Sequence, residues 1–272
     1  KYIEERSREK KPFFLYFPMC PPHSPIVPAP EFDGKSGIDG KEGKYADWGY
    51  QGDHMLGQIM DALKRTGQEK NTLLIATGDN GAAKRPYPPL REAKSSIYEG
   101  GHREPFVARW PGKIKAGSIN HDVICLNDLF ATCADILGAD LPADAAEDSV
   151  SILPALLGKA SGPLREATIN QAPAGLAIRQ GPWKFIMYRN GKRELYNLKD
   201  DISETKDVSQ YNGEVVGRLE KLMQSYIDRG RSTPGPVQKN DFELPFGKSG
   251  TKKRNKKNKK GKGSSAKQEV NQ

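Results

Sequence analysis

The chain has 272 residues, of which 36% are hydrophobic, so it is long enough for one large domain, or for a domain with a smaller subdomain and a tail. Its formal net charge of +9 at pH 7 would suggest a nucleic-acid-binding protein if the charge covered the folded surface. Residues 251–272, however, contribute +8 of that charge. The rest of the chain carries +1, which argues against a polyanion partner for the folded part.

The three cysteines, Cys20, Cys125 and Cys133, cannot all pair with one another, and none has the spacing of a metal site. Cys125 and Cys133 lie within an apolar segment, where small buried side chains are the ordinary interpretation. The cysteines therefore do not indicate a redox compartment.

Residues 1–11 have the composition of a polar helix and lead into the apolar run at residues 12–17. Such a uniformly apolar run is typical of a strand buried on both faces, in the middle of a sheet. A central strand needs neighbours, so we expect the chain to be the C-terminal part of a longer protein. No run has the length of a transmembrane helix and no signal peptide is visible, so we expect any targeting signal to lie upstream.

The next elements alternate between helix and strand. Apolar residues recur with a helical period over residues 45–63, a strand is expected at 72–76 and another at 106–110, and a helix at 126–137. This order predicts an α/β fold with a mostly parallel sheet flanked by helices. We assign it to residues 1–142.

Shorter elements follow. Residues 177–179 and 183–188 predict a hairpin, residues 194–197 a third antiparallel strand, and residues 214–229 an amphipathic helix. Residues 143–230 are therefore expected to form a small subdomain in which one helix covers an antiparallel sheet.

Residues 231–272 are predicted to form a disordered basic tail, because the run that ends the chain lacks the apolar residues that would offset the entropy of ordering. A basic run of this kind can contact anionic polymers, such as nucleic acid or anionic glycans, through salt-sensitive contacts. A solvated, solubilising tail is the alternative interpretation.

Polar residues follow two of the predicted strands. His23 lies in a Pro-rich loop after the first, and Asp79 and Asn80 come directly after the second. In open α/β sheets, ligands bind beyond the carboxyl ends of the strands. A carboxylate beside an amide suits a hard cation such as Ca²⁺, although Asp, Asn and Gly are also common turn formers. Lys94, one loop further on, would supply a cation for an anionic ligand.

Short motifs follow one another along residues 12–227: Pro-His-Ser-Pro from Pro22, Gly-Asp-Asn-Gly from Gly78, Lys94, Glu-Gly-Gly-His-Arg-Glu-Pro from Glu99, Arg-Trp-Pro-Gly from Arg109, Ala-Ile-Arg-Gln-Gly-Pro-Trp-Lys from Ala177 and Glu-Leu-Tyr-Asn-Leu from Glu194. In this order and spacing they resemble the sulfatases of the alkaline phosphatase superfamily. The order makes the resemblance much stronger than any single motif does.

The resemblance implies roles for four residues. Asp79 and Asn80 would be ligands of one calcium ion that holds the sulfate. His23 would bind the sulfate and assist departure of the alcohol, since an imidazole titrates near neutrality. Lys94 would hold a sulfate oxygen, where an ammonium opposes the charge that builds in the transition state. The implied activity is calcium-dependent hydrolysis of a sulfate ester, in a sulfated small molecule or a sulfated glycan.

The chain also departs from the family. Sulfatases use a formylglycine made from the cysteine of a Cys-x-Pro-x-Arg motif. Here Cys20 is followed by a suitably placed proline, but Ser24 stands where the arginine is expected, and neither Cys125 nor Cys133 begins such a motif. The nucleophile and the family's paired N-terminal aspartates are therefore expected upstream, and this chain alone is expected to be inactive. Family resemblance also predicts a periplasmic or extracellular location.

Two alternatives remain open. A two-metal phosphatase or phosphodiesterase of the same superfamily would need several Asp and His ligands. The chain has four histidines; Asp53 and His54 lie within a predicted helix, and His102 and His121 show no arrangement with carboxylates. The other alternative is an inactive, sulfatase-like protein that binds anions through its basic tail without calcium.

Overall fold

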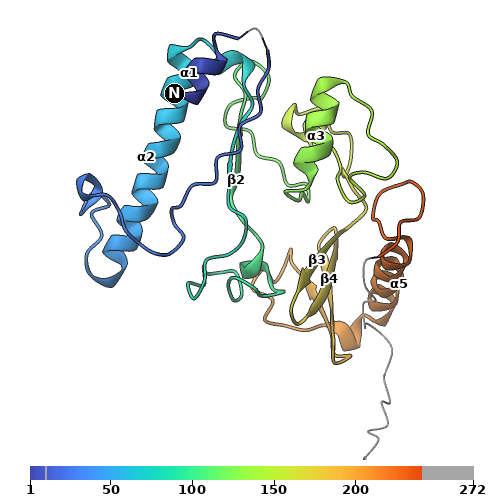
Figure 1. Ribbon diagram of the computed structural model, residues 1–272. Helices are drawn as coiled ribbons and strands as arrows, with labels where there is room; N and C mark the ends of the chain where they lie inside the picture. Colours follow the sequence, from blue (N-terminus) through green and yellow to red (C-terminus); the bar gives the residue numbers. More distant parts are fainter. Residues whose placement is uncertain (10, 241–272) are drawn as a thin grey trace, which may run out of the picture.

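The computed structural model describes residues 1–9 and 11–240. Most of the predicted tail, residues 241–272, lies outside the described residues. Figure 1 shows the long helix α2 on one side, the C-terminal sheet with helix α5 on the other, and the strands β1 and β2 between them. No helix in the described ranges has both the length and the apolar character needed to cross a membrane.

The N-terminal region is built on the helix α2, Gly43–Arg65, which confirms the helix predicted at residues 45–63. A shorter helix, α1 (Tyr2–Arg6), packs against its C-terminal end through Ile3, which is buried with Ala62 and Leu63. Short 3-10 turns connect the larger elements: η1 (Pro30–Phe32), η2 (Gly40–Glu42), η3 (Glu69–Asn71), η4 (Glu99–Gly101) and η5 (Ser209–Tyr211).

The strands β1 (Leu74–Thr77) and β2 (Phe106–Arg109) form where strands were predicted, but their pairing is antiparallel, with Thr77 opposite Phe106. The expectation of parallel pairing is wrong for this pair. The chain between them folds back as loops instead of forming the crossover helix that parallel strands require.

The prediction of a strand at residues 12–17 is also wrong. This segment makes no ladder with any strand of the described part of the chain. Instead, Phe14, Tyr16 and Phe17 are exposed. An apolar run forms a strand only when a neighbouring strand accepts its backbone hydrogen bonds, and no described segment does so here.

The C-terminal sheet has the order β3-β4-β5-β6, with every pair antiparallel. Its hairpin, β4 (Gly175–Gln180) and β5 (Trp183–Tyr188), and its last strand, β6 (Arg193–Asn197), confirm the predicted strands. The edge strand β3, Thr168–Ala172, was not predicted. The helix α5, Gly213–Arg229, packs against one face, as expected.

The two faces of this sheet differ in chemistry. One face is apolar and packs on α5: Leu176, Ile178, Phe185, Met187 and Leu195 against Leu219, Met223 and Tyr226. Because side chains alternate along a strand, the other face carries the intervening residues, which include Lys184 and Glu194. That face packs against Ile97 and Tyr98 of the preceding region, so polar groups are buried between the sheet and the loop.

Helix α3, Asp128–Leu137, begins at a buried carboxylate. Asp128 accepts hydrogen bonds from the backbone N–H of Cys125, at 2.7 Å, and of Val150, at 3.0 Å, and forms an ion pair with Arg165. The helix ends at Gly138, whose φ of 63° is the left-handed conformation that glycine favours. A short helix, α4 (Leu153–Leu156), follows. Cys125 and Cys133 are free and half-buried.

Residues 231–240, the described part of the predicted tail, lie against the folded chain. Arg231 is buried, and its Nη1 donates to the carbonyl oxygen of Ala143 at 2.7 Å. The backbone N–H of Thr233 donates to the carbonyl oxygen of Glu147 at 3.1 Å. The packed region therefore continues past the predicted boundary at residue 230.

Candidate active site

One pocket brings together residues from four places in the sequence. It has a volume of about 310 Å³, and it is lined by Asp79 and Asn80 after β1, by Lys94, by His102 after η4, and by Asn170 of β3. The other lining residues are Ser95, Ser96, Gly101, Gln171, Ala172 and Pro173. Three of the four residues assigned to the site from sequence, Asp79, Asn80 and Lys94, therefore meet in one place.

Glycine allows the two halves of this pocket to approach. The backbone N–H of Gly81 donates to the carbonyl oxygen of Gly101 at 3.0 Å. A Cβ atom at Gly81 would lie 1.9 Å from the carbonyl oxygen of Gly100 in the other half. Within that half, a Cβ atom at Gly101 would lie 2.2 Å from the carbonyl oxygen of Ser96. Only residues without a Cβ permit so close an approach. The Gly-Asp-Asn-Gly segment therefore packs on the Glu-Gly-Gly turn through direct backbone contact.

Asp79 and Asn80 lie at the rim of the pocket. The amide nitrogen of Asn80 donates to a carboxylate oxygen of Asp79. A second acid, Glu104, is close by: burial and the charge of Asp79 together raise the pKa of the Glu104 carboxyl. These carboxylates have no ion pair within the described residues. A cation bound here would relieve their mutual repulsion.

The oxygen donors suit calcium only in part. Asp79 and Asn80 offer one charged and one neutral oxygen, which suits Ca²⁺, but calcium takes about six to eight oxygen ligands. Across residues 1–9 and 11–240, no group of three or more His, Cys, Asp or Glu side chains is arranged to hold a metal. The pair therefore fits as part of a calcium site, and the remaining ligands have to come from elsewhere.

Lys94 sits on a loop that is held at both ends, by the segment after β6 and by β6 itself. At one end, Nη1 of Arg91 donates to the carbonyl oxygen of Glu204 at 2.6 Å. At the other end, the hydroxyl of Tyr98 donates to Glu194 Oε2 at 2.8 Å. Lys94 itself is exposed, and its ammonium has no hydrogen bond or ion pair with the described residues. An anchored loop thus presents a free cation to the pocket.

Behind the pocket lies a buried ionic cluster. Nζ of Lys184 lies 2.9 Å from Glu99 Oε1 and 2.8 Å from Glu204 Oε1, and Arg103 Nη1 lies 3.0 Å from Glu99 Oε2. Burial by itself would raise the pKa of Glu99, but the ammonium of Lys184 lowers it to about 2. Glu99 is therefore a charged anchor, as a buried carboxylate must be paired to stay ionised.

His102 joins this cluster to the pocket. Its Nε2 lies 3.3 Å from Lys184 Nζ and 3.3 Å from the carbonyl oxygen of Ile97. Burial and the neighbouring Lys184 ammonium lower the pKa of His102 to about 4, against the opposing charge of Glu99. The imidazole is therefore neutral at neutral pH. Sequence reasoning did not assign His102 a role, although its position directly after Glu99-Gly-Gly was a signal.

The structure does not bring His23 to this pocket. His23 is exposed on a separate loop, where its Nδ1 lies 2.7 Å from the carbonyl oxygen of Ser24. Its own carbonyl accepts a hydrogen bond from Trp48 Nε1 at 2.9 Å, which fixes the loop to α2. The role assigned to His23 stays a prediction.

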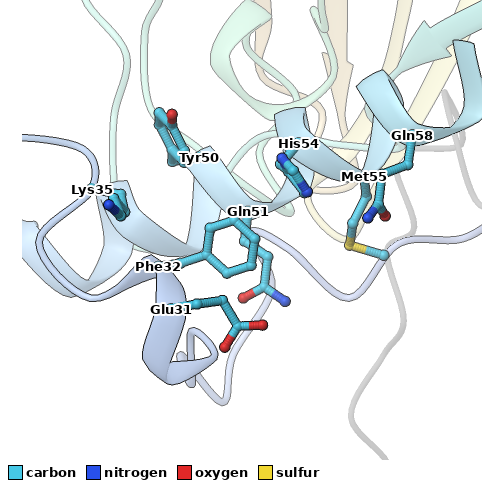
Figure 2. A pocket seen from close by; sticks show the side chains of 8 residues that line it. All are labelled: Glu31, Phe32, Lys35, Tyr50, Gln51, His54, Met55 and Gln58. Atoms are coloured by element: carbon cyan, nitrogen blue, oxygen red, sulfur yellow. The ribbon is translucent and has the colours of Figure 1, made fainter. Parts of the chain in front are cut away.

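A second cavity, of about 550 Å³, lies along α2 and η1. Figure 2 shows Phe32 and His54 among the residues that line it, and their two ring centroids are 5.2 Å apart. Asp53, the neighbour of His54, is exposed. His54 packs against an aromatic ring, and no group of three or more His, Cys, Asp or Glu side chains among the described residues is arranged to hold a metal around this pair.

Comparison with known proteins identifies the class to which this fold and pocket belong. A family model described as Sulfatase matches residues 1–139, and a model described as N-sulphoglucosamine sulphohydrolase, C-terminal, matches residues 93–231. Each match covers just over half of the chain. The chain belongs to the sulfatase family, which confirms the resemblance found in its motifs.

Individual relatives agree. The chain is 36% identical over 254 residues to an N-acetylgalactosamine-6-O-sulfatase of Bacteroides thetaiotaomicron, covering 82% of this chain and 48% of that protein. It is 34% identical over 163 residues to the human N-acetylgalactosamine-6-sulfatase, covering 57% of this chain and 30% of the relative.

A solved structure shows the same fold. The crystal structure of Ps i-CgsB in complex with k-i-k-neocarrahexaose matches with a TM-score of 0.76 at 26% identity, over 87% of this chain and 55% of that one. This likeness supports the predicted alkaline phosphatase-like α/β class with its antiparallel C-terminal sheet. The chain spans about half the length of these two relatives, the Bacteroides sulfatase and Ps i-CgsB.

Proposed function

We propose that the protein containing this chain hydrolyses sulfate esters, and that the chain supplies one side of the active site. The observation that carries the proposal is the pocket in which Asp79, Asn80 and the unpaired ammonium of Lys94 meet. Membership of the sulfatase family supports the same reaction class.

In this proposal each residue acts on the sulfate or on the leaving oxygen. Lys94 neutralises charge on the sulfate oxygens, where a fixed ammonium in a partly enclosed site stabilises the transition state more than water does. Asp79 and Asn80 would hold a calcium ion, which when bound orients the sulfate. His23 would donate a proton to the departing alcohol oxygen, once the rest of the protein closes the site around it.

None of the three cysteines of this chain begins the Cys-x-Pro-x-Arg motif from which sulfatases make their nucleophile. By the family resemblance it is a formylglycine that an upstream segment carries, together with further calcium ligands. We also propose a periplasmic or extracellular location, from the family resemblance. A sulfated sugar is the proposed substrate, since the Bacteroides relative is named an N-acetylgalactosamine-6-O-sulfatase. We further propose that the catalytic domain ends at residue 142, the boundary predicted from the sequence.

The test uses the full-length protein, coexpressed with a formylglycine-generating enzyme. Release of an aryl alcohol from an aryl sulfate, and of sulfate from N-acetylgalactosamine 6-sulfate, is measured with calcium and after chelation. Turnover is expected to need calcium and to fall at least about 100-fold in Lys94→Ala and Asp79→Ala, in line with loss of a group that stabilises the transition state. Lys199→Ala, on an exposed turn, is the matched control.

Two outcomes would overturn the proposal. The first is an intact, correctly modified protein that hydrolyses neither ester. The second is turnover that persists in both site variants. Retention on a sulfated polymer without turnover, lost when residues 251–272 are deleted, would instead favour the anion-binding alternative.

A further inference from the structure

We propose that His102 and Asn170 form a neutral wall of the pocket that binds hydroxyl or amide oxygens of the sugar carrying the sulfate, with His102 Nδ1 as a hydrogen-bond donor. The inference rests on the proposed function and deepens it, because it separates recognition of the sugar from recognition of the sulfate. It is carried by the charges and the free hydrogen-bonding groups of the side chains that line the pocket.

The side chains that line the pocket differ in charge. Among those described, Asp79 and Lys94 are formally charged, whereas His102 and Asn170 are neutral. A sulfated sugar has the same division, since its sulfate is anionic and its ring substituents are neutral. The charged groups suit the sulfate, which leaves the neutral groups for the sugar.

The orientation of His102 follows from its contact with Lys184. An ammonium has three protons and accepts no hydrogen bond. Two of its three neighbours are the carboxylates of Glu99 and Glu204, and the third is His102 Nε2 at 3.3 Å. Nε2 therefore accepts, which places the ring proton of the neutral imidazole on Nδ1. The carbonyl of Ile97, also 3.3 Å away, is a weaker influence because it carries no charge.

The other ring nitrogen is free to bind a ligand. Nδ1 of His102 makes no hydrogen bond with any described residue, and it is not among the buried unpartnered atoms. Since the residue lines the pocket and its ring is held from behind, this N–H is available as a fixed donor. Burial beside Lys184 keeps the imidazole neutral, as suits a donor to an uncharged oxygen.

Asn170 faces the same region from the sheet. It pairs with Ala177 across β3 and β4, and Ala177 pairs with Ile186 of β5. Asn170 thus lies on the sheet face that carries Lys184 and packs against Tyr98, because strand neighbours in register share a face. Its side-chain amide has no hydrogen bond with the described residues, so it retains both a donor and an acceptor for a ligand.

Two substitutions of His102 test the roles of its two ring nitrogens separately. In His102→Gln the amide reaches the position of Nε2, so the contact with Lys184 is kept while the donor at Nδ1 is lost. In His102→Asn the shorter amide stands near Nδ1, so the donor is kept while the contact with Lys184 is lost. Asn170→Ala removes the second group, and Gln210→Ala is a control on exposed η5.

The measurement is the ratio of kcat/KM for N-acetylgalactosamine 6-sulfate to kcat/KM for an aryl sulfate, in the complete, modified protein with calcium. Loss of one hydrogen bond to an uncharged oxygen is expected to lower the ratio about 3- to 10-fold in His102→Gln and in Asn170→Ala. The ratio is expected to fall less in His102→Asn than in His102→Gln. In Gln210→Ala it is expected to equal that of the unaltered protein.

The outcomes separate this inference from the proposed function. If the unaltered protein hydrolyses no sulfate ester, the proposed function fails first. If it hydrolyses the aryl sulfate but the ratio in His102→Gln and Asn170→Ala equals that of Gln210→Ala, the neutral wall is overturned. If His102→Asn loses as much of the ratio as His102→Gln, or more, the donor role of Nδ1 is overturned. Hydrolysis of the aryl sulfate with none of the sugar sulfate would also overturn it.

Discussion

Nζ of Lys184 lies 2.9 Å from Oε1 of Glu99, and both side chains are buried. Lys184 belongs to β5 of the C-terminal sheet, whereas Glu99 begins the turn η4 that follows the Lys94 loop. This ion pair therefore fixes the pocket loop to a sheet more than 80 residues away in the sequence. Through it, the C-terminal sheet determines the geometry of a pocket whose charged residues all precede it.

Lys184→Met is expected to destabilise the protein by about 3–5 kcal/mol, because it leaves the two buried carboxylates of Glu99 and Glu204 without their common cation. The free energy of unfolding from urea titration measures the effect. Lys199→Met, which removes an exposed lysine after β6, is the control and is expected to change stability by less than about 0.5 kcal/mol. Equal losses in the two variants would contradict the role assigned to the buried cluster.

Gly81→Ala is expected to separate the Asp79 loop from η4, since its Cβ would lie 1.9 Å from a backbone oxygen. We expect a loss of about 1–3 kcal/mol in stability and lower turnover of an aryl sulfate. Gly57→Ala, within α2, is the control: a Cβ at this position would have no neighbouring atom within 4 Å, and the substitution should stabilise the helix by about 0.5–1 kcal/mol. Wild-type turnover in Gly81→Ala would show that this close approach is dispensable.

The stability of the protein should depend on the protonation of His102. Its folded pKa of about 4 lies below the ordinary value of 6.5, so between these values the unfolded chain binds the proton and the folded chain does not. The stability that the neutral ring contributes is thus fully present above about pH 6.5 and is lost as the pH falls toward 4. The groups that face the ring are Lys184, Glu99, Arg179 and the carbonyl of Ile97.

The measurement is the unfolding free energy at several pH values from about 7 to about 4.5, for the unaltered protein and for His102→Gln. The unaltered protein should lose stability more steeply, because glutamine does not titrate and all other groups are shared. Parallel profiles for the two proteins would show that His102 is not held neutral in the folded state.

Calcium is expected to raise the melting temperature of the complete protein, because a ligand that binds only the folded state stabilises it, by about 2.7 kcal/mol at 100 times its Kd. Asp79→Ala should abolish this response. Asp53→Ala, an exposed carboxylate on α2, should leave it intact. A response that survives in Asp79→Ala would remove Asp79 from the ligand set.

Deletion of residues 251–272 removes a formal charge of +8 and is expected to lower the salt concentration at which the protein elutes from heparin. The aryl sulfatase activity should be retained, because Asp79, Asn80 and Lys94 all remain in the shortened protein. Elution that does not change after the deletion would assign heparin contacts to the folded part.

The sequence by itself determined the local elements and the chemical residue types of the site. The helical period of α2 and α5 and the hairpin of β4 and β5 depend on neighbouring residues, and they appear close to where they were predicted. The ordered motifs identified the family, and three of the four residues that they assigned, Asp79, Asn80 and Lys94, line one pocket.

Only the tertiary structure decided which surfaces meet. Residues 12–17 have the composition of a buried strand, yet a strand also needs a partner, which local sequence does not specify. The polar strand β3 gave no apolar pattern to recognise, and it contributes Asn170 to the pocket. Lys184 would be expected in solvent from its residue type, but the sheet places it between Glu99 and Glu204. Its burial, and with it the neutral state of His102, depends on contacts between distant segments.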